Sequence, residues 1–367
     1  VCEGCGDCGV QSNCTSLMPL ETPLGRKRVV DQSSCNQDLS CIKGFCPSFV
    51  TVIGADSSKR ALEAVPKVDA PRLPKPDVVD VPAPIPSDLA TPWRIMVAGV
   101  GGTGVITIGQ LLGVAAHIEG KGCATMNQTG LAQKFGAVVS HVRVSQDQED
   151  IKAVRIPAGE ADLLLGADLV VTTTYEAMGK VAQGRTHAVV NEAEVPTSAF
   201  ILDPDARFPT AAMKGKIAEE VGAEDCHFID ATHIATALLG DSIASNLFLL
   251  GFAWQRGLVP VGAASLEEAI ELNAVAVDFN KQAFLWGRRC AHQPQKVLEL
   301  VALDRPIDDV DCQLTDLSFV LLDDPSCEHL RDQTSQARVL GRVLENHPQR
   351  QVADDVADLL GLVARHR

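Results

Sequence analysis

Seven of the chain's twelve cysteines lie between residues 2 and 46, and this clustering constrains the fold of that segment more than any other feature. An odd number of cysteines cannot pair completely as disulfides, and these short spacings are typical of metal ligands. We therefore expect residues 1–55 to fold around a metal centre. The seven are Cys2, Cys5, Cys8, Cys14, Cys35, Cys41 and Cys46.

The run Cys2-x2-Cys5-x2-Cys8 supplies three thiolates at the spacing with which one loop wraps a cubane cluster. In bacterial ferredoxins the fourth ligand is a distant cysteine that precedes a proline, and here Cys46 precedes Pro47. These four cysteines predict a 4Fe-4S cluster that passes electrons. The alternative is a zinc ribbon, which needs two separated ligand pairs rather than three cysteines in one short run.

The other three cysteines of the segment, Cys14, Cys35 and Cys41, depart from the tight ferredoxin spacing. They supply three thiolates, whereas a cubane takes four ligands. A second cluster of another type, a second cluster with a non-cysteine ligand, and no second cluster all stay open. We expect this set to form the weaker site.

Glycines stand among the first cysteines, at positions 4, 6 and 9. Glycine adopts positive φ without steric cost, so it lets a loop turn its amides toward cluster sulfides. We expect all three glycines to have this role.

The pattern of the chain changes twice after the cysteines. Residues 56–92 bring a proline every few positions, which is typical of an extended, semi-rigid linker. Across 93–291, short apolar runs alternate with helical stretches, which predicts an α/β domain with a doubly wound, mostly parallel, Rossmann-like sheet. Residues 292–367 are charged and weakly patterned, with one amphipathic helix expected near 352–366.

Two apolar helical stretches close the α/β domain, at about 233–256 and 265–289. Ser265 with Glu268 three residues later predicts a capping box at the start of the second stretch. Asp241 precedes a serine after a glycine, and we interpret it as a helix start.

A glycine-rich turn follows the apolar run RIMVAGV and opens a helix, which is the context of a dinucleotide-binding motif. Its glycines, Gly99, Gly101, Gly102 and Gly104, would let a phosphate approach a helix N-terminus. A tight turn that needs small residues only for packing is an equally good interpretation. A nicotinamide site needs Asp or Glu at the end of the second strand to bind the ribose. The sequence there is CATMNQT, without an acid, so we discount NAD and keep a phosphate or a neighbouring protein segment as occupants of the turn.

Gln133 and Lys134 follow the next expected strand, where α/β sheets place their ligands. They are candidates for contacting an anionic group. His141 and Arg143 lie at alternate positions of the run AVVSHVRVS, hence on one face of a strand, and we expect a structural role for them.

The charge balance of 32 basic and 47 acidic side chains gives a net charge of −15, without a Lys/Arg-rich run. This argues against nucleic acid and anionic membranes as partners. No run is long and apolar enough for a membrane span, so we expect a soluble cytoplasmic protein. The chain begins without Met inside a cysteine motif, and we expect it to be a piece of a longer polypeptide.

Four segments together resemble the indolepyruvate ferredoxin oxidoreductases in their long, fused bacterial form. They are VCEGCGDCG with GRKRVVDQSSCNQDLSCIKGFCPSFVTV, then VAGVGGTGVITIGQLL, TGLAQKFGAVVSHVR and GDSIASNLFLLGFAWQRGLVP. The resemblance covers roughly residues 1–290, as a ferredoxin-like segment followed by the gamma domain of the 2-oxoacid:ferredoxin oxidoreductase family.

The resemblance implies oxidative decarboxylation of an aryl-pyruvate with coenzyme A, with two electrons passed to ferredoxin. Thiamine diphosphate with Mg does the carbon chemistry in such enzymes, on thiamine-binding domains of the same polypeptide or complex. This implies that thiamine diphosphate, Mg and coenzyme A bind largely outside this chain, that the protein is an oligomer, and that the chain alone is inactive. The rivals are a non-enzymatic electron carrier or assembly subunit and a nicotinamide-dependent oxidoreductase.

Overall fold

The computed structural model describes residues 2–31, 34–44, 46–49, 81–84, 89–130, 136–195, 197, 203 and 206–303. Most of the predicted linker and the helix expected near 352–366 lie outside these residues. The chain divides into two units. One contains Gly4–Gly44 and Leu73–Arg305, and the other contains Val1–Glu3, Phe45–Arg72 and Pro306–Arg367.

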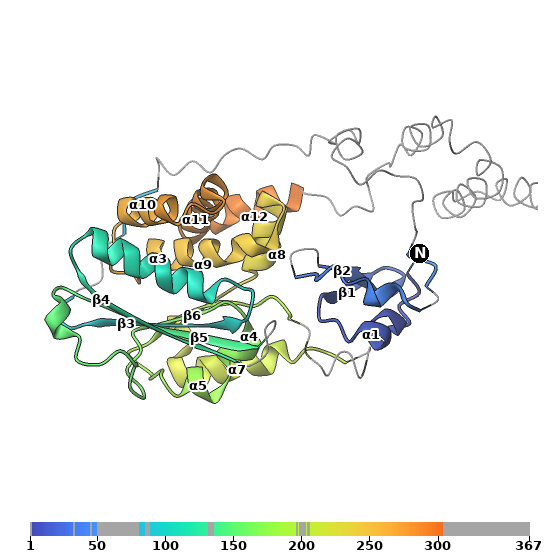
Figure 1. Cartoon of the computed structure of the whole chain (residues 1–367), viewed down its shortest axis with the longest axis horizontal. Coiled ribbons are helices and arrows are strands. Elements are labelled where there is room, and N and C mark those ends of the chain that lie inside the picture. Colours follow the sequence, from blue (N-terminus) through green and yellow to red (C-terminus); the bar gives the residue numbers. More distant parts are fainter. Residues whose placement is uncertain are drawn as a thin grey trace, which may run out of the picture. The chain divides into compact units, whose positions relative to one another are not determined.

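The cysteine segment contains one short helix, a hairpin and a 3-10 turn (Figure 1). Strands β1 (Leu17–Thr22) and β2 (Gly25–Val30) pair antiparallel, with Thr22 opposite Gly25 across a two-residue loop. Gly25 takes φ 93°, and its carbonyl accepts a 2.7 Å hydrogen bond from the Thr22 hydroxyl. Helix α1 (Asp7–Ser12) packs against the 3-10 turn η1 (Ser40–Ile42), so the two cysteine runs meet there. A ferredoxin-like fold for this segment stays a prediction.

Six strands form the central sheet in the order β4-β5-β3-β6-β7-β8. Strands β3, β6, β7 and β8 are parallel, which confirms a mostly parallel sheet, while β5 is antiparallel to both of its neighbours. The strands are β3 (Trp93–Val100), β4 (Gly122–Thr129), β5 (Ala137–Ser145), β6 (Leu163–Gly166), β7 (His187–Asn191) and β8 (Cys226–Ile229).

The arrangement of β3, β4 and β5 differs from that of a doubly wound nucleotide-binding sheet. In such a sheet the second strand lies beside the first and parallel to it. Only residues 130–136 connect β4 to β5. A connection this short suits an antiparallel neighbour, whereas a parallel one needs a crossover of a dozen or more residues. Strand β4 therefore lies two positions from β3, with β5 between them.

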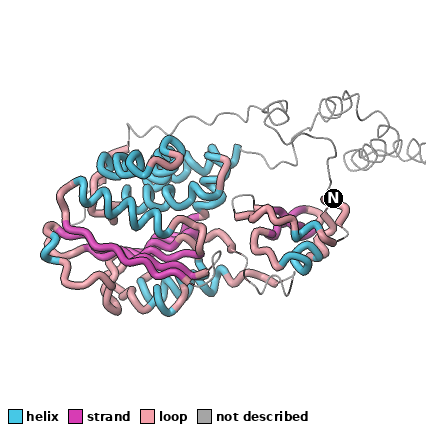
Figure 2. The backbone as a smooth tube through the Cα atoms, viewed as in Figure 1, coloured by secondary structure: helices cyan, strands magenta, loops and turns pink. Residues whose placement is uncertain are grey.

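Helices cover both faces of the sheet (Figures 1 and 2). One face carries α3 (Val105–Ile118), α8 (Ala231–Leu239), α9 (Ser245–Gln255), α10 (Ala263–Asn273), α11 (Val277–His292) and α12 (Pro294–Leu303). The other carries α4 (Leu169–Thr172), α5 (Tyr175–Met178) and α7 (Thr210–Val221). Alternate residues of β3 feed the two cores: Ile95 and Val97 pack on one side, and Met96 and Ala98 on the other.

Helices α9 and α11 cross closely because glycines stand where they touch. A Cβ on Gly251 would overlap the Phe284 carbonyl, and a Cβ on Gly287 would overlap the Phe248 carbonyl. No helix in the described part of the chain is both long and apolar enough to cross a membrane.

Each of the two predicted apolar stretches is divided into two helices. Gly240, at φ 82°, ends α8, and residues 274–276 separate α10 from α11. The predicted capping box at Ser265 is wrong: α10 begins at Ala263, behind Gly262. Asp241 is a helix start as expected, because its carboxylate accepts a 3.0 Å hydrogen bond from the Ile243 amide.

Candidate functional site

The glycine-rich turn joins β3 to α3, as predicted, at the carboxyl edge of the sheet. Gly102 and Gly104 have φ 104° and 81°, a conformation that side-chain-bearing residues adopt only with strain. A Cβ on Gly102 would meet nothing within 4 Å, so that glycine faces open space. Gly99, in contrast, packs tightly, since its Cβ would lie 2.8 Å from the Cβ of Ala167.

A buried carboxylate supports the turn from behind. Asp168 is fully buried, and its two oxygens accept hydrogen bonds from the amides of Val100, at 2.6 Å, and Val171, at 2.8 Å. Burial raises the pKa of Asp168, while these amides act in the opposite direction. The hydrogen bonds tie the end of β3 to the first turn of α4. Sequence patterns did not single out this residue.

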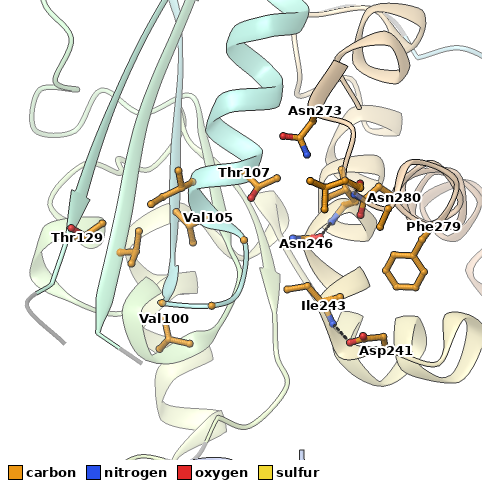
Figure 3. A pocket seen from close by; sticks show the side chains of 18 of the residues that line it. Val100, Val105, Thr107, Thr129, Asp241, Ile243, Asn246, Asn273, Phe279 and Asn280 are labelled. Carbon is orange, nitrogen blue, oxygen red and sulfur yellow. Dashed lines mark hydrogen bonds between the residues drawn. The ribbon is translucent and has the colours of Figure 1, made fainter. Parts of the chain in front are cut away.

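A pocket of about 1000 Å³ opens above the turn (Figure 3). The turn and the first residues of α3 form one wall, and the ends of β4 and β5 contribute a second. By helix geometry, the first amides of α3 have no carbonyl partner within the helix, so they present donors here. The remaining wall comes from the start of α9 and from the connection between α10 and α11. Its labelled members are Asp241, Ile243, Asn246, Asn273, Phe279 and Asn280.

Asn246 is the polar residue of this pocket that sequence reasoning missed. It is 5% exposed, and its Oδ1 accepts a hydrogen bond from the Leu247 amide. Its Nδ2 lies against Gly104, where a Cβ would collide with it. In Figure 3 the side chain stands between the glycine turn and the α10–α11 connection. Asn246 thus adds an amide donor beside the helix N-terminus.

The connection between α10 and α11 has an unusual backbone. Ala274 and Ala276 take φ 55° and 43°, the left-handed region in which alanine is uncommon. Val275 between them is 62% exposed, and Phe279 and Ile243 line the pocket nearby. This side of the pocket therefore mixes apolar residues with the polar Asp241, Asn273 and Asn280.

Gln133 and Lys134 lie outside the described residues. The ends of their segment are described: the Gly101 amide donates a 2.7 Å hydrogen bond to the Gly136 carbonyl, and Gly130 lines the pocket. Contact of Gln133 or Lys134 with a ligand stays a prediction.

His141 and Arg143 lie on one face of β5, as predicted, and both are buried. The Ile156 amide donates to His141 Nδ1 at 3.2 Å, and Arg143 donates to the Ala153 carbonyl at 2.5 Å. Burial lowers the pKa of His141 to about 4, so its ring is neutral near pH 7. Both side chains hold the segment after β5 against the sheet, which agrees with a structural role.

The cysteine segment shows part of its predicted arrangement. Gly4 and Gly6 have φ 75° and 76°, as expected for a cluster loop. The prediction of positive φ for Gly9 is wrong, because this residue lies inside helix α1. None of the ten described cysteines forms a disulfide. Cys2 and Cys46 belong to the other unit, so their pairing with Cys5 and Cys8 remains a prediction from spacing.

The second cysteine set is brought together within the segment. Burial raises the pKa of the Cys41 thiol, and the nearby Cys14 and Cys35 raise it further by charge repulsion. The Gln37 amide points at Cys35 Sγ, 3.3 Å away. Thiolates that repel one another and accept amide hydrogen bonds are suited to a cationic iron-sulfur core. This donor set fits the predicted cofactor.

Together, the fold and the pocket define a class: an α/β domain with a mostly parallel sheet and a glycine turn at a ligand-sized cavity. Residues 94–290 match the family profile described as pyruvate ferredoxin/flavodoxin oxidoreductase, which is more than half of the chain. The chain belongs to this family, and the predicted membership among the 2-oxoacid:ferredoxin oxidoreductases is confirmed.

Curated relatives match a little over half of the chain. The chain is 28% identical over 203 residues to indolepyruvate oxidoreductase subunit IorB of Thermococcus kodakarensis, covering 55% of this chain and 96% of the relative. A protein of the same name from Pyrococcus horikoshii is 29% identical over 203 residues, with the same coverage. The 2-oxoglutarate synthase subunit KorC of Methanothermobacter marburgensis is 29% identical over 210 residues, covering 55% and 98%.

Solved structures with similar chains include the gamma subunit of a keto/oxoacid ferredoxin oxidoreductase from Geobacter sulfurreducens. It is 22% identical, has a TM-score of 0.37, and covers 54% of this chain and 98% of that one. Pyruvate oxidoreductase subunit PORC from Thermotoga maritima is 18% identical with a TM-score of 0.39, covering 54% and 96%.

Proposed function

We propose that the chain is the gamma component, fused to an electron-relay segment, of an indolepyruvate:ferredoxin oxidoreductase. The overall reaction converts an aryl-pyruvate, coenzyme A and two oxidised ferredoxins into acyl-CoA, carbon dioxide, a proton and two reduced ferredoxins. Thiamine diphosphate with Mg supplies the carbanion chemistry when bound to domains outside this chain. The protein works in the cytoplasm as an oligomer with those domains.

The choice of an aryl-pyruvate is carried by one observation: this chain matches proteins named as indolepyruvate oxidoreductase subunits along almost their whole length. The match to 2-oxoglutarate synthase subunits is of similar identity and makes 2-oxoglutarate the substrate to test against it.

The electron relay is assigned to the cysteine segment. Cys2, Cys5, Cys8 and Cys46 are proposed to hold one 4Fe-4S cluster, because their spacing reproduces three-plus-one ligation. Cys14, Cys35 and Cys41 are proposed to hold a second, weaker one.

The pocket is proposed to receive an anionic group of a reactant. Helix-terminal amides and Asn246 Nδ2 supply donors, and Val275 and Phe279 add apolar surface to the pocket. Coenzyme A is the reactant to test first, because it carries phosphates beside a long organic chain. This pocket would contact one part of it, and the remainder would bind outside this chain, as the resemblance implies. The glycines at 99, 101, 102 and 104 permit this approach, and Lys134 is proposed to add a positive charge.

The test uses the complete polypeptide or complex that contains this chain, purified without oxygen. Ferredoxin reduction is measured with indolepyruvate, pyruvate and 2-oxoglutarate, with and without coenzyme A. We expect reduction that depends on coenzyme A, with kcat/KM for indolepyruvate more than about tenfold above the other acids, since a pocket built for an aromatic group discriminates at this level.

Two results would contradict the proposal. Preference for 2-oxoglutarate would place the protein with the 2-oxoglutarate synthases. Oxidation or reduction of a nicotinamide in place of ferredoxin, together with saturable NADH binding, would support the nicotinamide-dependent rival.

A further inference from the structure

The second cysteine set repeats the spacing of the first when a carboxylate is included. Residues 35, 38 and 41 read Cys35-x2-Asp38-x2-Cys41, the intervals of Cys2-x2-Cys5-x2-Cys8. The gap of five residues between Cys35 and Cys41 is therefore a regular cluster run whose central ligand position holds aspartate in place of cysteine.

The structure places Asp38 among the thiols of this set. Cys14, Cys35 and Asp38 each lie near enough to Cys41 for their charges to act on its thiol. Both described hydrogen bonds of the carboxylate go to Oδ1, from the Ser40 amide at 3.0 Å and the Ser40 hydroxyl at 2.7 Å. Oδ2 is thus the oxygen that can bind a metal.

The backbone on both sides of Asp38 has the conformation of a cluster loop. Gln37 and Leu39 take φ 57° and 58°, although neither is glycine. The left-handed conformation at residue 37 accompanies the contact of its amide with Cys35 Sγ, which turns a donor toward a ligand sulfur. Side-chain-bearing residues accept this strain where the surrounding structure requires it, commonly at functional sites.

The two cysteine runs also pack on each other, as an exchange of ligands between them requires. Helix α1 carries Cys8 and contacts the 3-10 turn that carries Cys41. Gly44 lies so close to the Asp7 carboxylate that a Cβ there would overlap it. Cys14, which follows the first run, can therefore be a ligand of a cluster held by the second run.

We infer that Asp38 is the fourth ligand of a second cubane cluster, bound through Oδ2 and held together with Cys14, Cys35 and Cys41. This inference rests on the proposed electron relay and specifies its second site. Within the described residues, no three ligand side chains converge tightly enough for a single metal ion. The ligands of a cubane lie farther apart than those of one ion, because the irons and sulfides of the cluster lie between them.

An oxygen ligand makes one iron of this cluster chemically distinct. Carboxylate is a hard ligand that iron accepts in other proteins, but thiolate is the ligand that retains iron in clusters. Ferricyanide removes one electron from [4Fe-4S]2+ and becomes ferrocyanide. The resulting [4Fe-4S]3+ would release Fe2+ and leave [3Fe-4S]+, and on this inference the iron held by Asp38 would be the one lost.

The experiment reconstitutes the full chain with iron and sulfide without oxygen, then adds one equivalent of ferricyanide per cluster. Iron, sulfide and zinc are measured, and electron paramagnetic resonance detects the paramagnetic [3Fe-4S]+ form against the silent [4Fe-4S]2+ form. The variants are Asp38→Cys, Asp38→Ala and, as a control carboxylate of the same segment, Glu21→Gln. Glu21 pairs with Arg26 on the hairpin, outside the cysteine runs.

We expect wild type and Glu21→Gln to lose one iron and to show the [3Fe-4S]+ signal. Asp38→Cys should retain that iron and lose most of the signal, and Asp38→Ala should already contain less iron per sulfide than wild type before ferricyanide is added. If all four proteins hold two clusters and respond alike, the role of Asp38 is overturned while the relay stands. If wild type holds no acid-labile sulfide, or holds zinc instead, the relay itself fails.

Discussion

The side-chain amide of Asn246 occupies the space that a Cβ on Gly104 would need. The two residues are far apart in the chain but meet at the N-terminus of α3, where Gly104 has φ 81°. The turn therefore needs glycine for two independent reasons, the backbone conformation and the close approach of Asn246.

Replacing Gly104 by Ala should lower the free energy of unfolding by about 2–4 kcal/mol, because strain at positive φ adds to a clash with the buried Asn246 side chain. Chemical denaturation of the full chain measures this. Gly102→Ala is the matched comparison, since it has positive φ but no neighbour within 4 Å, and it should cost only about 1 kcal/mol. Equal losses in the two variants would show that Asn246 does not press on the turn.

Asn246→Ala should weaken binding of coenzyme A by roughly tenfold, because one hydrogen-bond donor to a charged group is lost. Asn246→Asp should weaken it more, because the new charge repels a phosphate. Isothermal titration calorimetry on the complete polypeptide or complex that contains this chain measures both. Arg155→Ala serves as the control: Arg155 pairs with Glu176, is not part of the pocket lining, and should bind like wild type. Unchanged affinity in both Asn246 variants would remove the pocket from coenzyme A binding.

His141 should make the protein less stable as the pH falls from 6.5 toward 4. Its pKa is lowered to about 4 in the folded chain against 6.5 for an ordinary histidine, so the unfolded chain binds more protons across this range. The loss attributable to this group is at most about 3 kcal/mol. Urea denaturation at several pH values, compared with His141→Asn, isolates it. An identical pH slope in the variant would argue that His141 titrates normally.

Cys5→Ala should remove most of the low-potential cluster signal in electron paramagnetic resonance of the dithionite-reduced chain, whereas Cys41→Ala should leave that signal in place. The reason is that Cys5 belongs to the three-plus-one set and Cys41 to the second set. Loss of the same signal in both variants would mean that a single site draws its ligands from both runs.

The isolated chain should not decarboxylate indolepyruvate when thiamine diphosphate, magnesium and coenzyme A are added. The motif that holds magnesium and thiamine diphosphate is not recognisable in its 367 residues. Release of carbon dioxide from indolepyruvate measures this, and turnover above the uncatalysed rate would contradict it.

Local patterns determined much of the fold. The alternation of apolar runs with helical stretches predicted a mostly parallel sheet covered on both faces, because a strand such as β3 that is buried on both sides must be apolar throughout. The run GVGGTG predicted the strand-to-helix turn because glycine adopts positive φ without steric cost, as Gly102 and Gly104 do in this turn.

Other local predictions failed where neighbouring residues decided the conformation. Gly9 lacks positive φ because the chain around it continues as helix α1. Ser265 does not cap α10 because Gly262, whose amide donates to the Glu119 carboxylate, begins that helix earlier. Each residue type allowed the predicted conformation without requiring it.

By itself, the sequence determined the α/β class, the glycine turn and the family, because each depends on residues that are close together in the chain. Tertiary structure alone decided that β5 inserts antiparallel beside β3 and that the Asn246 side chain lies against Gly104 at the pocket. The physical reason is that strand pairing and side-chain convergence depend on packing between distant segments. The spacing of residues along the chain does not specify which distant segments pack together.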